Sequence, residues 1–358
     1  MTVFVLNFFS ICLYAIIYDF IKKKYGKSQI VFVFLMVLIT AQMCALLALR
    51  SVEIGIDTRA YLNRFNRYKL LTLSKIFRDD FQEHGYSLLI KIIAVVYDNF
   101  NFFLTCVSLI TIPLVVVSVA KLSKKPFLSL LIFIAFDYYA SYFCLIRQSI
   151  AYSLCIFSFL CIQNKKPVKF ILLVLLAAQF HKSAYIFLPA YWIANIKMNR
   201  YTLAGLGLVF IVVVIFKNKF YDLVENGLYS TVDHAYEAKN TGAFMLLVRQ
   251  FAIAGVMLFF AGKNSLSSIN YNRFTMLVCA GAILSVFATI GGNAQRAANY
   301  YCMFLIFGIP ELLDNLEDSM VKRIVNYTVI VGVLAMFVYA MIADGYKIMP
   351  YSSILFGK

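Results

Sequence analysis

Charged residues are scarce in this 358-residue chain. Only 14% of the residues are Asp, Glu, Lys or Arg, and 62% are hydrophobic, whereas a soluble globular chain averages roughly 25% charged and 45–50% apolar residues. The apolar residues form runs of about 20, separated by short polar loops, which is the pattern of transmembrane helices. The alternating segments of a β-barrel are absent. The sequence therefore predicts an all-α fold, a polytopic transmembrane helical bundle.

Several motifs of familiar enzymes are also absent. The chain has no Asp-x-Asp pair, which argues against a sugar–nucleotide transferase with a carboxylate-held metal ion. It has no Walker loop, Gly-x-Gly-x-x-Gly or His-Glu-x-x-His either. None of its eight cysteines forms Cys-x-x-Cys, and all fall in apolar runs, as small core residues do. We therefore expect neither a metal ion nor a cofactor.

The apolar runs predict one integral membrane domain over residues 1–358, with about 11–13 membrane helices when short and broken ones are included. The first run has no basic segment before it, so we interpret it as a retained helix rather than a signal peptide. The segment 84–97 is short and amphipathic, which favours a re-entrant or interfacial helix. The expected spans lie near residues 2–20, 29–49, 101–120, 127–145, 148–163, 168–181, 183–196, 201–217, 242–261, 270–290, 297–313 and 324–343.

The formal net charge is +16. In a soluble protein such an excess would suggest nucleic acid, but here the lysines gather in short loops, which fits the positive-inside rule. We therefore expect no nucleic-acid partner, and we place the longer loops 50–83 and 217–241, together with both termini, outside the cell membrane. The basic loops predicted to be cytoplasmic are 22–27, 121–125, 165–169, 197–200 and 322–323.

Arginine interrupts two of the apolar runs, at Arg147 and Arg249. A guanidinium keeps its proton, and placing it at mid-membrane costs about 2.5–3.5 kcal/mol on insertion scales. Such residues usually face a water-filled cavity or an anionic partner. Gln148 adds neutral donors and an acceptor beside Arg147, and a planar guanidinium suits two phosphate oxygens. The alternative is that Arg147 lies near a helix end and extends to the membrane surface.

Three other groups of polar residues stand where apolar runs end. In the first, Gly55 predicts a tight turn that brings Asp57 back towards Arg50; a salt-bridged loop with a helix cap is the alternative. In the second, His181, Lys182 and Ser183 follow a short helix, where His181 would carry a proton or donate to a phosphate, unless it is a hydrogen-bonded core residue.

The third group follows Gly291-Gly292. A helix begins there, and a helix N-terminus attracts anions. Arg296 and Tyr300 are four residues apart and share a face of that helix. An ordinary loop-to-helix junction is the alternative.

Together these positions resemble the EpsG-like family, within the Wzy-type polysaccharide polymerases. The resemblance covers residues 50–301. Each short motif alone is weak evidence for the family, and the order and spacing of the motifs together are specific. Lys182 and Arg249 are not part of the pattern. The matching residues are Arg50, Gly55, Asp57, Thr58 and Tyr61, then Glu83 and Tyr86, then Arg147, then Phe180, His181 and Ser183, and finally Arg296 and Tyr300.

The resemblance implies a multi-pass protein of the bacterial cytoplasmic (inner) membrane that polymerises lipid-linked oligosaccharide repeat units on the outer face. The donor would be a growing glycan on undecaprenyl diphosphate, and the acceptor a second lipid-linked unit. Membrane lipids, a chain-length regulator and a flippase are the partners that this role implies. A glycan ligase with a different acceptor, a flippase or exporter of lipid-linked glycans, and a solute transporter remain alternatives.

Such a transfer assigns roles to the polar residues. The catalytic set contains Asp57 as the first candidate base and Glu83 as the second, with Arg147 and Arg296 stabilising the leaving diphosphate and His181 as a further donor. Arg249 joins the two arginines at the diphosphate. The substrate-binding set is Arg50, Thr58, Tyr61, Tyr86, Gln148, Lys182, Arg249 and Tyr300.

Overall fold

The computed structural model describes residues 1–26, 28–78, 83–228, 241–261, 268–290, 292–317 and 319–355. Within these ranges all regular elements are helices, apart from an isolated antiparallel bridge between Arg50 and Ser353. The predicted all-α fold is therefore confirmed.

Eight helices in the described part of the chain are long and apolar enough to cross a membrane. They are α1 (Thr2–Tyr25), α2 (Gln29–Ala48), α6 (Phe100–Leu122), α9 (Ile146–Gln163), α12 (Arg200–Leu228), α13 (Thr241–Ala261), α14 (Ile269–Leu284) with its 3₁₀ extension η2 (Ser285–Thr289), and α17 (Ser319–Ala343). Shorter apolar helices are α5 (His84–Val96) and α10 (Pro167–Ala178). The multi-pass helical bundle expected from the sequence is thus present.

The predicted span 127–145 is broken in the structure. It forms α7 (Pro126–Ala135) and α8 (Tyr138–Cys144), which together are apolar and long enough to span and are bent by 54°. Asp137 lies at the break with a left-handed backbone, φ 63°, a conformation that Asp tolerates better than most residues. Hydropathy does not detect such a bend because both halves are apolar.

The chain divides into two compact units, which we describe separately. Unit 1 comprises Met1–Phe157, Gln179–His181 and Ile324–Lys358, and unit 2 comprises Ser158–Ala178 and Lys182–Arg323. Besides helices already named, unit 1 contains α3 (Thr58–Tyr68) and α4 (Leu73–Ile76), and unit 2 contains η1 (Lys182–Phe187), α11 (Ala190–Asn195), α15 (Gly292–Cys302) and α16 (Leu305–Asn315).

The basic end of unit 1 is defined by three helix termini. Lys22, Lys23 and Lys24 lie in the last turn of α1, and Lys121 lies in the last turn of α6. The start of α7 is tied to this end by ring contacts of Phe127 with Tyr18 of α1 and Phe32 of α2. Two of the loops predicted to be cytoplasmic therefore lie at the same end of the unit.

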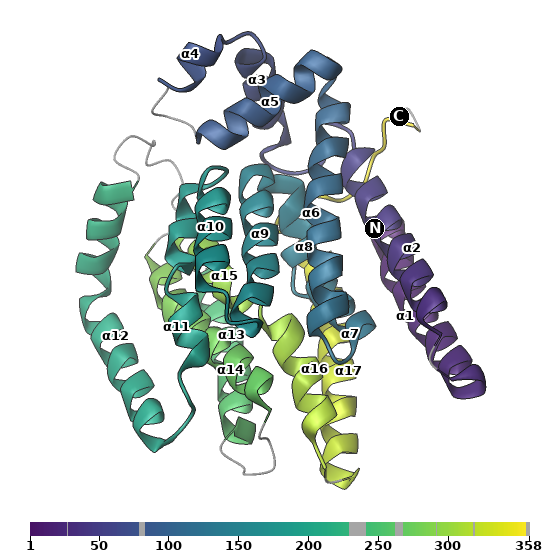
Figure 1. Ribbon diagram of the computed structural model, residues 1–358, viewed down its shortest axis with the longest axis vertical. Coiled ribbons are helices and arrows are strands. Elements are labelled where there is room, and N and C mark those ends of the chain that lie inside the picture. The colour runs from purple at the N-terminus through teal and green to yellow at the C-terminus, as the bar shows by residue number, and fades with distance from the viewer. Residues whose placement is uncertain are drawn as a thin grey trace. The chain divides into compact units, whose positions relative to one another are not determined.

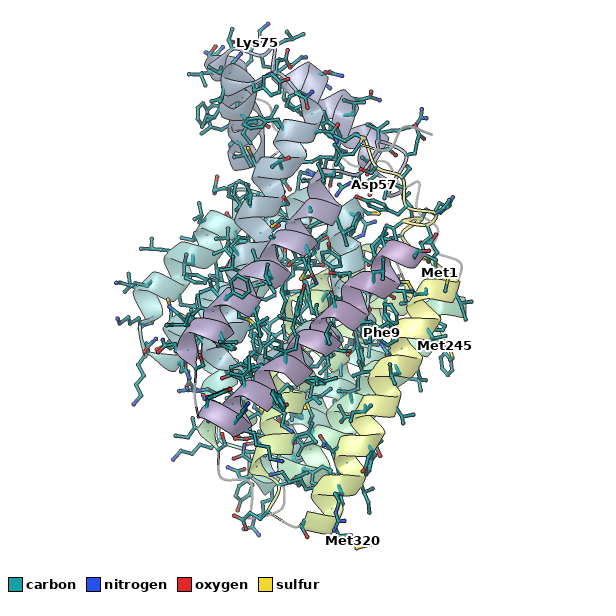
Figure 2. The ribbon with its side chains drawn as sticks, turned by 90° about the vertical axis from the view of Figure 1, so that its right-hand side faces the viewer. Met1, Phe9, Asp57, Lys75, Met245 and Met320 are labelled. Atoms are coloured by element: carbon teal, nitrogen blue, oxygen red, sulfur yellow. The ribbon has the colours of Figure 1, made fainter. Side chains whose placement is uncertain are left out.

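The opposite end of unit 1 carries the stretch between α2 and α6. Asn101, at the start of α6, donates to the carbonyl oxygens of Ala48 and Arg50 at the end of α2, over 3.4 and 3.0 Å. The intervening residues therefore leave and re-enter the bundle at one end, where α3, α4 and α5 form a helical cap (Figure 1). Figure 2 shows Asp57 at the Met1 end of α1, with Lys75 farther out on the cap.

Helix α5 lies in the helical cap and is shorter than the candidate membrane spans (Figure 1). Tyr86, Ile90 and Ile93 are buried, whereas the apolar side chains of Val95 and Val96 are exposed. The re-entrant or interfacial placement of 84–97 stays a prediction. The stretch 50–83, expected to be an external loop, contains α3 and α4 rather than irregular chain alone.

Unit 2 is organised around α14. Phe274 of α14 stacks with Phe307 of α16, and Gly281 allows the backbone of α15 to approach, because a Cβ there would lie 2.7 Å from the Cys302 nitrogen. The expected span 297–313 is divided between α15 and α16. In the predicted loop 217–241, α12 continues to Leu228, and residues 229–240 lie outside the described part of the chain.

Candidate functional site

The loop before α3 is shaped by a close approach to α8. Gly55 has φ 95°, and a Cβ at this position would lie 2.8 Å from the carbonyl oxygen of Phe143. Thr58 completes the turn by donating to the carbonyl oxygen of Ile54 over 2.6 Å. Only glycine combines this backbone conformation with so little space, so the predicted tight turn is present.

Asp57 is the residue immediately before α3, at the N-cap position. Its side chain makes no capping hydrogen bond, although Asp usually accepts one there. Asp57 is half-buried. The carboxylate is therefore not used to cap the helix. The alternative interpretation of Asp57 as a helix cap does not apply.

Arg50 does not meet Asp57 as the turn suggested. Its Nη1 donates to the carbonyl oxygen of Leu47 over 3.1 Å, and its guanidinium lies over the Phe143 ring at 5.2 Å. Arg50 is 1% exposed, so contact with a substrate would require the surrounding helices to move. The three ion pairs found among the described residues do not include it.

The segment 346–354, which we call the C-terminal strap, runs along the Asp57 loop. The backbone nitrogens of Ser51, Gly55 and Ile56 donate to the carbonyl oxygens of Ser352, Lys347 and Tyr346 over 3.0, 3.0 and 3.2 Å. In the opposite direction, the backbone nitrogen of Ile354 in the strap donates to the carbonyl oxygen of Leu49 over 2.9 Å. In the sequence, the turn-forming pair Asp344-Gly345 is the only local signal of this strap.

A largely buried ion pair of unit 1 joins Glu83 and Arg147. Arg147 Nη1 lies 2.6 Å from Glu83 Oε2, and the two side chains are 17% and 9% exposed. Glu83 immediately precedes α5, and Arg147 is the second residue of α9. The sequence analysis placed both residues at the site but did not pair them. Such a pair forms charge-assisted hydrogen bonds in a largely dry environment.

Two tyrosines line this ion pair. Tyr86 is fully buried, Tyr61 is 5% exposed, and their rings meet edge to face at 6.1 Å. Arg147 lies 6.0 Å from the centre of the Tyr86 ring and interacts electrostatically with Tyr61. Burial raises the pKa of Tyr86 well above its ordinary value, so its hydroxyl keeps its proton. These rings form a wall behind the ion pair, and stacking of Tyr86 on a sugar would require that wall to open.

The segment 179–181 joins the same end of unit 1. A Cβ on Gly85 would lie 2.7 Å from Gln179 Cβ and 2.9 Å from the Gln179 carbonyl oxygen, so the glycine lets this segment rest on the first turn of α5. His181, two residues along, is half-buried. Asp57, Glu83, Arg147 and His181, all predicted catalytic residues, thus belong to one compact unit.

The sequence was compared with models of known protein families. The model of the EpsG family matches residues 33–353, which include the cap, the ion pair and most of the C-terminal strap. The chain belongs to the EpsG family. Membership links it to polysaccharide biosynthesis, as a glycosyltransferase-like polymerase with several membrane helices. Neither a curated protein nor a solved structure shows significant similarity to the chain.

The remaining positions that resemble the EpsG pattern lie in unit 2. The hydroxyl oxygens of Ser183 and Tyr300 are 3.1 Å apart, and both side chains are buried. Tyr301 donates to the carbonyl oxygen of Ile186 over 2.7 Å. These contacts join η1 to α15, so a short 3₁₀ segment is fixed to the helix that carries Arg296.

The other cationic candidates have different environments. Lys182 is exposed at the start of η1, and Arg296 is half-buried on α15. Arg249 lies within the apolar helix α13 and interacts electrostatically with Cys302. Gln148, beside Arg147 on α9, is 1% exposed. The candidate residues of the EpsG-family chain therefore form one set in each unit.

Proposed function

We propose that this EpsG-family protein joins oligosaccharide repeat units carried on undecaprenyl diphosphate, by glycosyl transfer on the outer face of a bacterial cytoplasmic membrane. The observation that carries the proposal is the buried Glu83–Arg147 pair, which has Asp57 on the preceding loop and His181 on the adjoining segment of the same unit. Intramembrane or boundary arginines of this kind mark sites for anionic substrates.

The orientation follows from the two ends of unit 1. The lysines at the ends of α1 and α6 favour the cytoplasmic side. The cap formed by α3, α4 and α5 lies at the other end (Figure 1). The Glu83–Arg147 pair, at the start of α5, is then external, which is where assembled repeat units are polymerised in the proposed reaction.

In the proposed step, a hydroxyl oxygen of the acceptor sugar attacks the anomeric carbon of the donor glycan. A new glycosidic C–O bond forms, and the bond from the anomeric carbon to the diphosphate oxygen breaks. Undecaprenyl diphosphate leaves with the bonding electron pair, and the acceptor proton passes to a carboxylate. A guanidinium that is already in place stabilises the charge that develops on the leaving oxygen, and we assign this role to Arg147.

Two observations support a choice between the candidate bases. Glu83 is held by Arg147 at 2.6 Å, and a neighbouring positive charge makes a carboxylate a weaker base. Asp57 makes no capping hydrogen bond and is half-buried. We therefore propose Asp57 as the general base and Glu83 as the residue that orients Arg147. Arg249, Arg296 and His181 are proposed as further donors to the diphosphate.

The proposal is tested by the size distribution of the polysaccharide in a deletion strain complemented with wild type or Arg147→Ala at matched membrane levels. We expect wild type to restore a ladder and Arg147→Ala to leave single lipid-linked units. Arg59→Ala is the control, because Arg59 forms an exposed pair with Glu53, and it should behave as wild type. Full-length chains with Arg147→Ala would remove Arg147 from the site.

Two outcomes of the same experiment would replace the proposed function. Precursors trapped on the cytoplasmic face of the deletion strain would indicate a flippase or exporter. Normal polymer that fails to reach its final acceptor would indicate a glycan ligase.

A further inference from the structure

Arg50 borders a small cavity inside unit 1. The cavity has a volume of about 10 Å³, which is close to the room that one water molecule needs. All its lining residues are buried, and they come from α2, α6, α8, α9 and the residue after α2's cap. They are Leu47, Arg50, Leu104, Val107, Ser108, Thr111, Tyr142, Ile146 and Ser149.

The guanidinium of Arg50 has donors that no protein atom accepts. Nη1 donates to Leu47, and the Phe143 ring covers one face of the group. Nε and Nη2 are buried and have no acceptor among the described residues. Burial lowers the pKa of Arg50 to about 10, which leaves the group charged at neutral pH. A buried charged donor without an acceptor is strongly unfavourable, so an acceptor is required beside it.

The two serines and the threonine of the cavity wall offer oxygen lone pairs rather than protons, whereas the Tyr142 hydroxyl is hydrogen-bonded to Ser153 over 3.0 Å. Ser108 Oγ donates to Thr105, Thr111 Oγ1 donates to Val107, and Ser149 Oγ donates to Ile146, over 2.8, 3.0 and 2.8 Å. Each hydroxyl proton is therefore already used within its own helix. The hydroxyl oxygens of these residues, on α6 and α9, can therefore act only as hydrogen-bond acceptors towards the cavity.

The occupant must accept from Arg50 and donate to these hydroxyl oxygens. A halide ion has no proton to donate, and a metal cation would be repelled by the guanidinium. Water does both and fits the volume. We propose that one ordered water molecule occupies this cavity, accepts a hydrogen bond from Arg50, and donates to the hydroxyl oxygens of Ser108, Thr111 or Ser149.

The consequence concerns the role of Arg50. Through the water, the end of α2 is linked to α6 and to Ser149, which lies two residues after Arg147 on α9. Arg50 is then a positioning residue that fixes the first turn of α9, and it does not contact the polysaccharide substrate. The hydration site itself does not depend on the proposed function, so it stands or fails separately.

The direct test is a structure of the full chain in a lipid nanodisc, at a resolution that shows ordered water. We expect one spherical density within hydrogen-bonding distance of Arg50 Nε or Nη2 and of at least one wall hydroxyl. A cavity without density would overturn the proposal. Crystals grown with bromide in place of chloride add a second arm: an anomalous peak at the site would identify a halide and would overturn the assignment to water.

A mutational test uses Val107→Ile, which adds one methylene at the cavity wall. In wild type the added group displaces the water and leaves Arg50 without an acceptor, so the melting temperature should fall. In an Arg50→Met background the same substitution fills an apolar space, so the melting temperature should rise. Val115→Ile, on α6 but outside the cavity lining, is the control and should shift both backgrounds equally. A rise with Val107→Ile in wild type would mean that no water is held there.

Discussion

Arg147 on α9 and Glu83 at the start of α5 are 64 positions apart in sequence, and their charged atoms lie 2.6 Å apart. Neither residue reaches this position through its own helix alone. Glu83 is positioned by the helical cap of α3, α4 and α5, which lies between α2 and α6 in the chain. Arg147 is positioned by α9, which begins directly after the bent pair of helices α7 and α8. The ion pair therefore forms only when the whole capped end of unit 1 is assembled.

Glu83→Gln should abolish polymer formation and destabilise the protein. Removing one partner of a buried pair leaves the other charge uncompensated, at a cost of about 3–5 kcal/mol. Thermal unfolding in detergent and polymer length at matched protein levels measure the two effects. The double variant Glu83→Gln/Arg147→Gln should recover much of the stability without recovering activity.

The matched control for this pair is Glu53→Gln, which breaks the exposed pair with Arg59. Exposed pairs contribute little to stability, so neither melting temperature nor polymer length should change. Wild-type chain length with Glu83→Gln would show that the ion pair has no part in the reaction.

Asp57→Asn should slow turnover without unfolding the protein, because the Asp57 side chain makes no capping hydrogen bond. Loss of a general base typically lowers kcat by about 10²–10⁴-fold, whereas KM for the lipid-linked unit should change little. Initial rates of chain extension by the purified protein would separate the two constants. Asp98→Asn, which breaks the exposed pair with Lys69, is the control; a normal rate with Asp57→Asn would transfer the role of base to another group.

Gly85→Ala should impair activity although alanine favours helices. Its Cβ would lie 2.7 Å from Gln179 Cβ, and the segment that ends at His181 would have to shift. Overpacking of this kind costs about 1–3 kcal/mol, and a displacement of 1 Å at a site lowers rates by up to about 100-fold. Gly332→Ala, where the added Cβ meets nothing within 4 Å, is the control. Equal activity of the two variants would show that this contact does not position the segment.

Removal of residues 346–358 should abolish polymerisation and lower the melting temperature, whereas removal of 356–358 alone should do neither. The longer deletion takes away the backbone acceptors of Ser51, Gly55 and Ile56, and each such hydrogen bond contributes about 0.5–1.5 kcal/mol net. Polymer length and thermal unfolding are again the readouts. If the longer deletion still makes full-length polymer, the strap is not needed to hold the Asp57 loop.

Local sequence features predicted local structure well. The apolar runs at 2–20 and 29–49 form α1 and α2, the segment 84–97 forms the short helix α5, and Gly55 has the positive φ expected of a tight turn. In each case the relevant physics lies within one or two helical turns. The bend at Asp137 escaped detection because apolar residues flank it on both sides.

Local sequence patterns do not predict contacts between residues that are far apart in the chain. Arg50 is among the predicted substrate-binding residues, and its 1% exposure depends on residues such as Phe143 that are far from it in sequence. The pairing of Glu83 with Arg147 depends on where two distant helices begin. The C-terminal strap is held largely by backbone hydrogen bonds, in most of which its carbonyl oxygens accept. Every residue has such a carbonyl, so these bonds leave no pattern in the sequence.

The strap also fixes an order of assembly. The loop that carries Asp57 leaves the ribosome early, but its hydrogen-bond partners at Tyr346 and Lys347 follow after roughly 290 further residues, which take roughly 15–60 s to synthesise. During that time the loop lacks the backbone acceptors that finally hold it. It reaches its paired form only after α17 has been inserted, so a nascent chain stalled before this helix would carry every proposed catalytic residue and still be unable to extend a glycan.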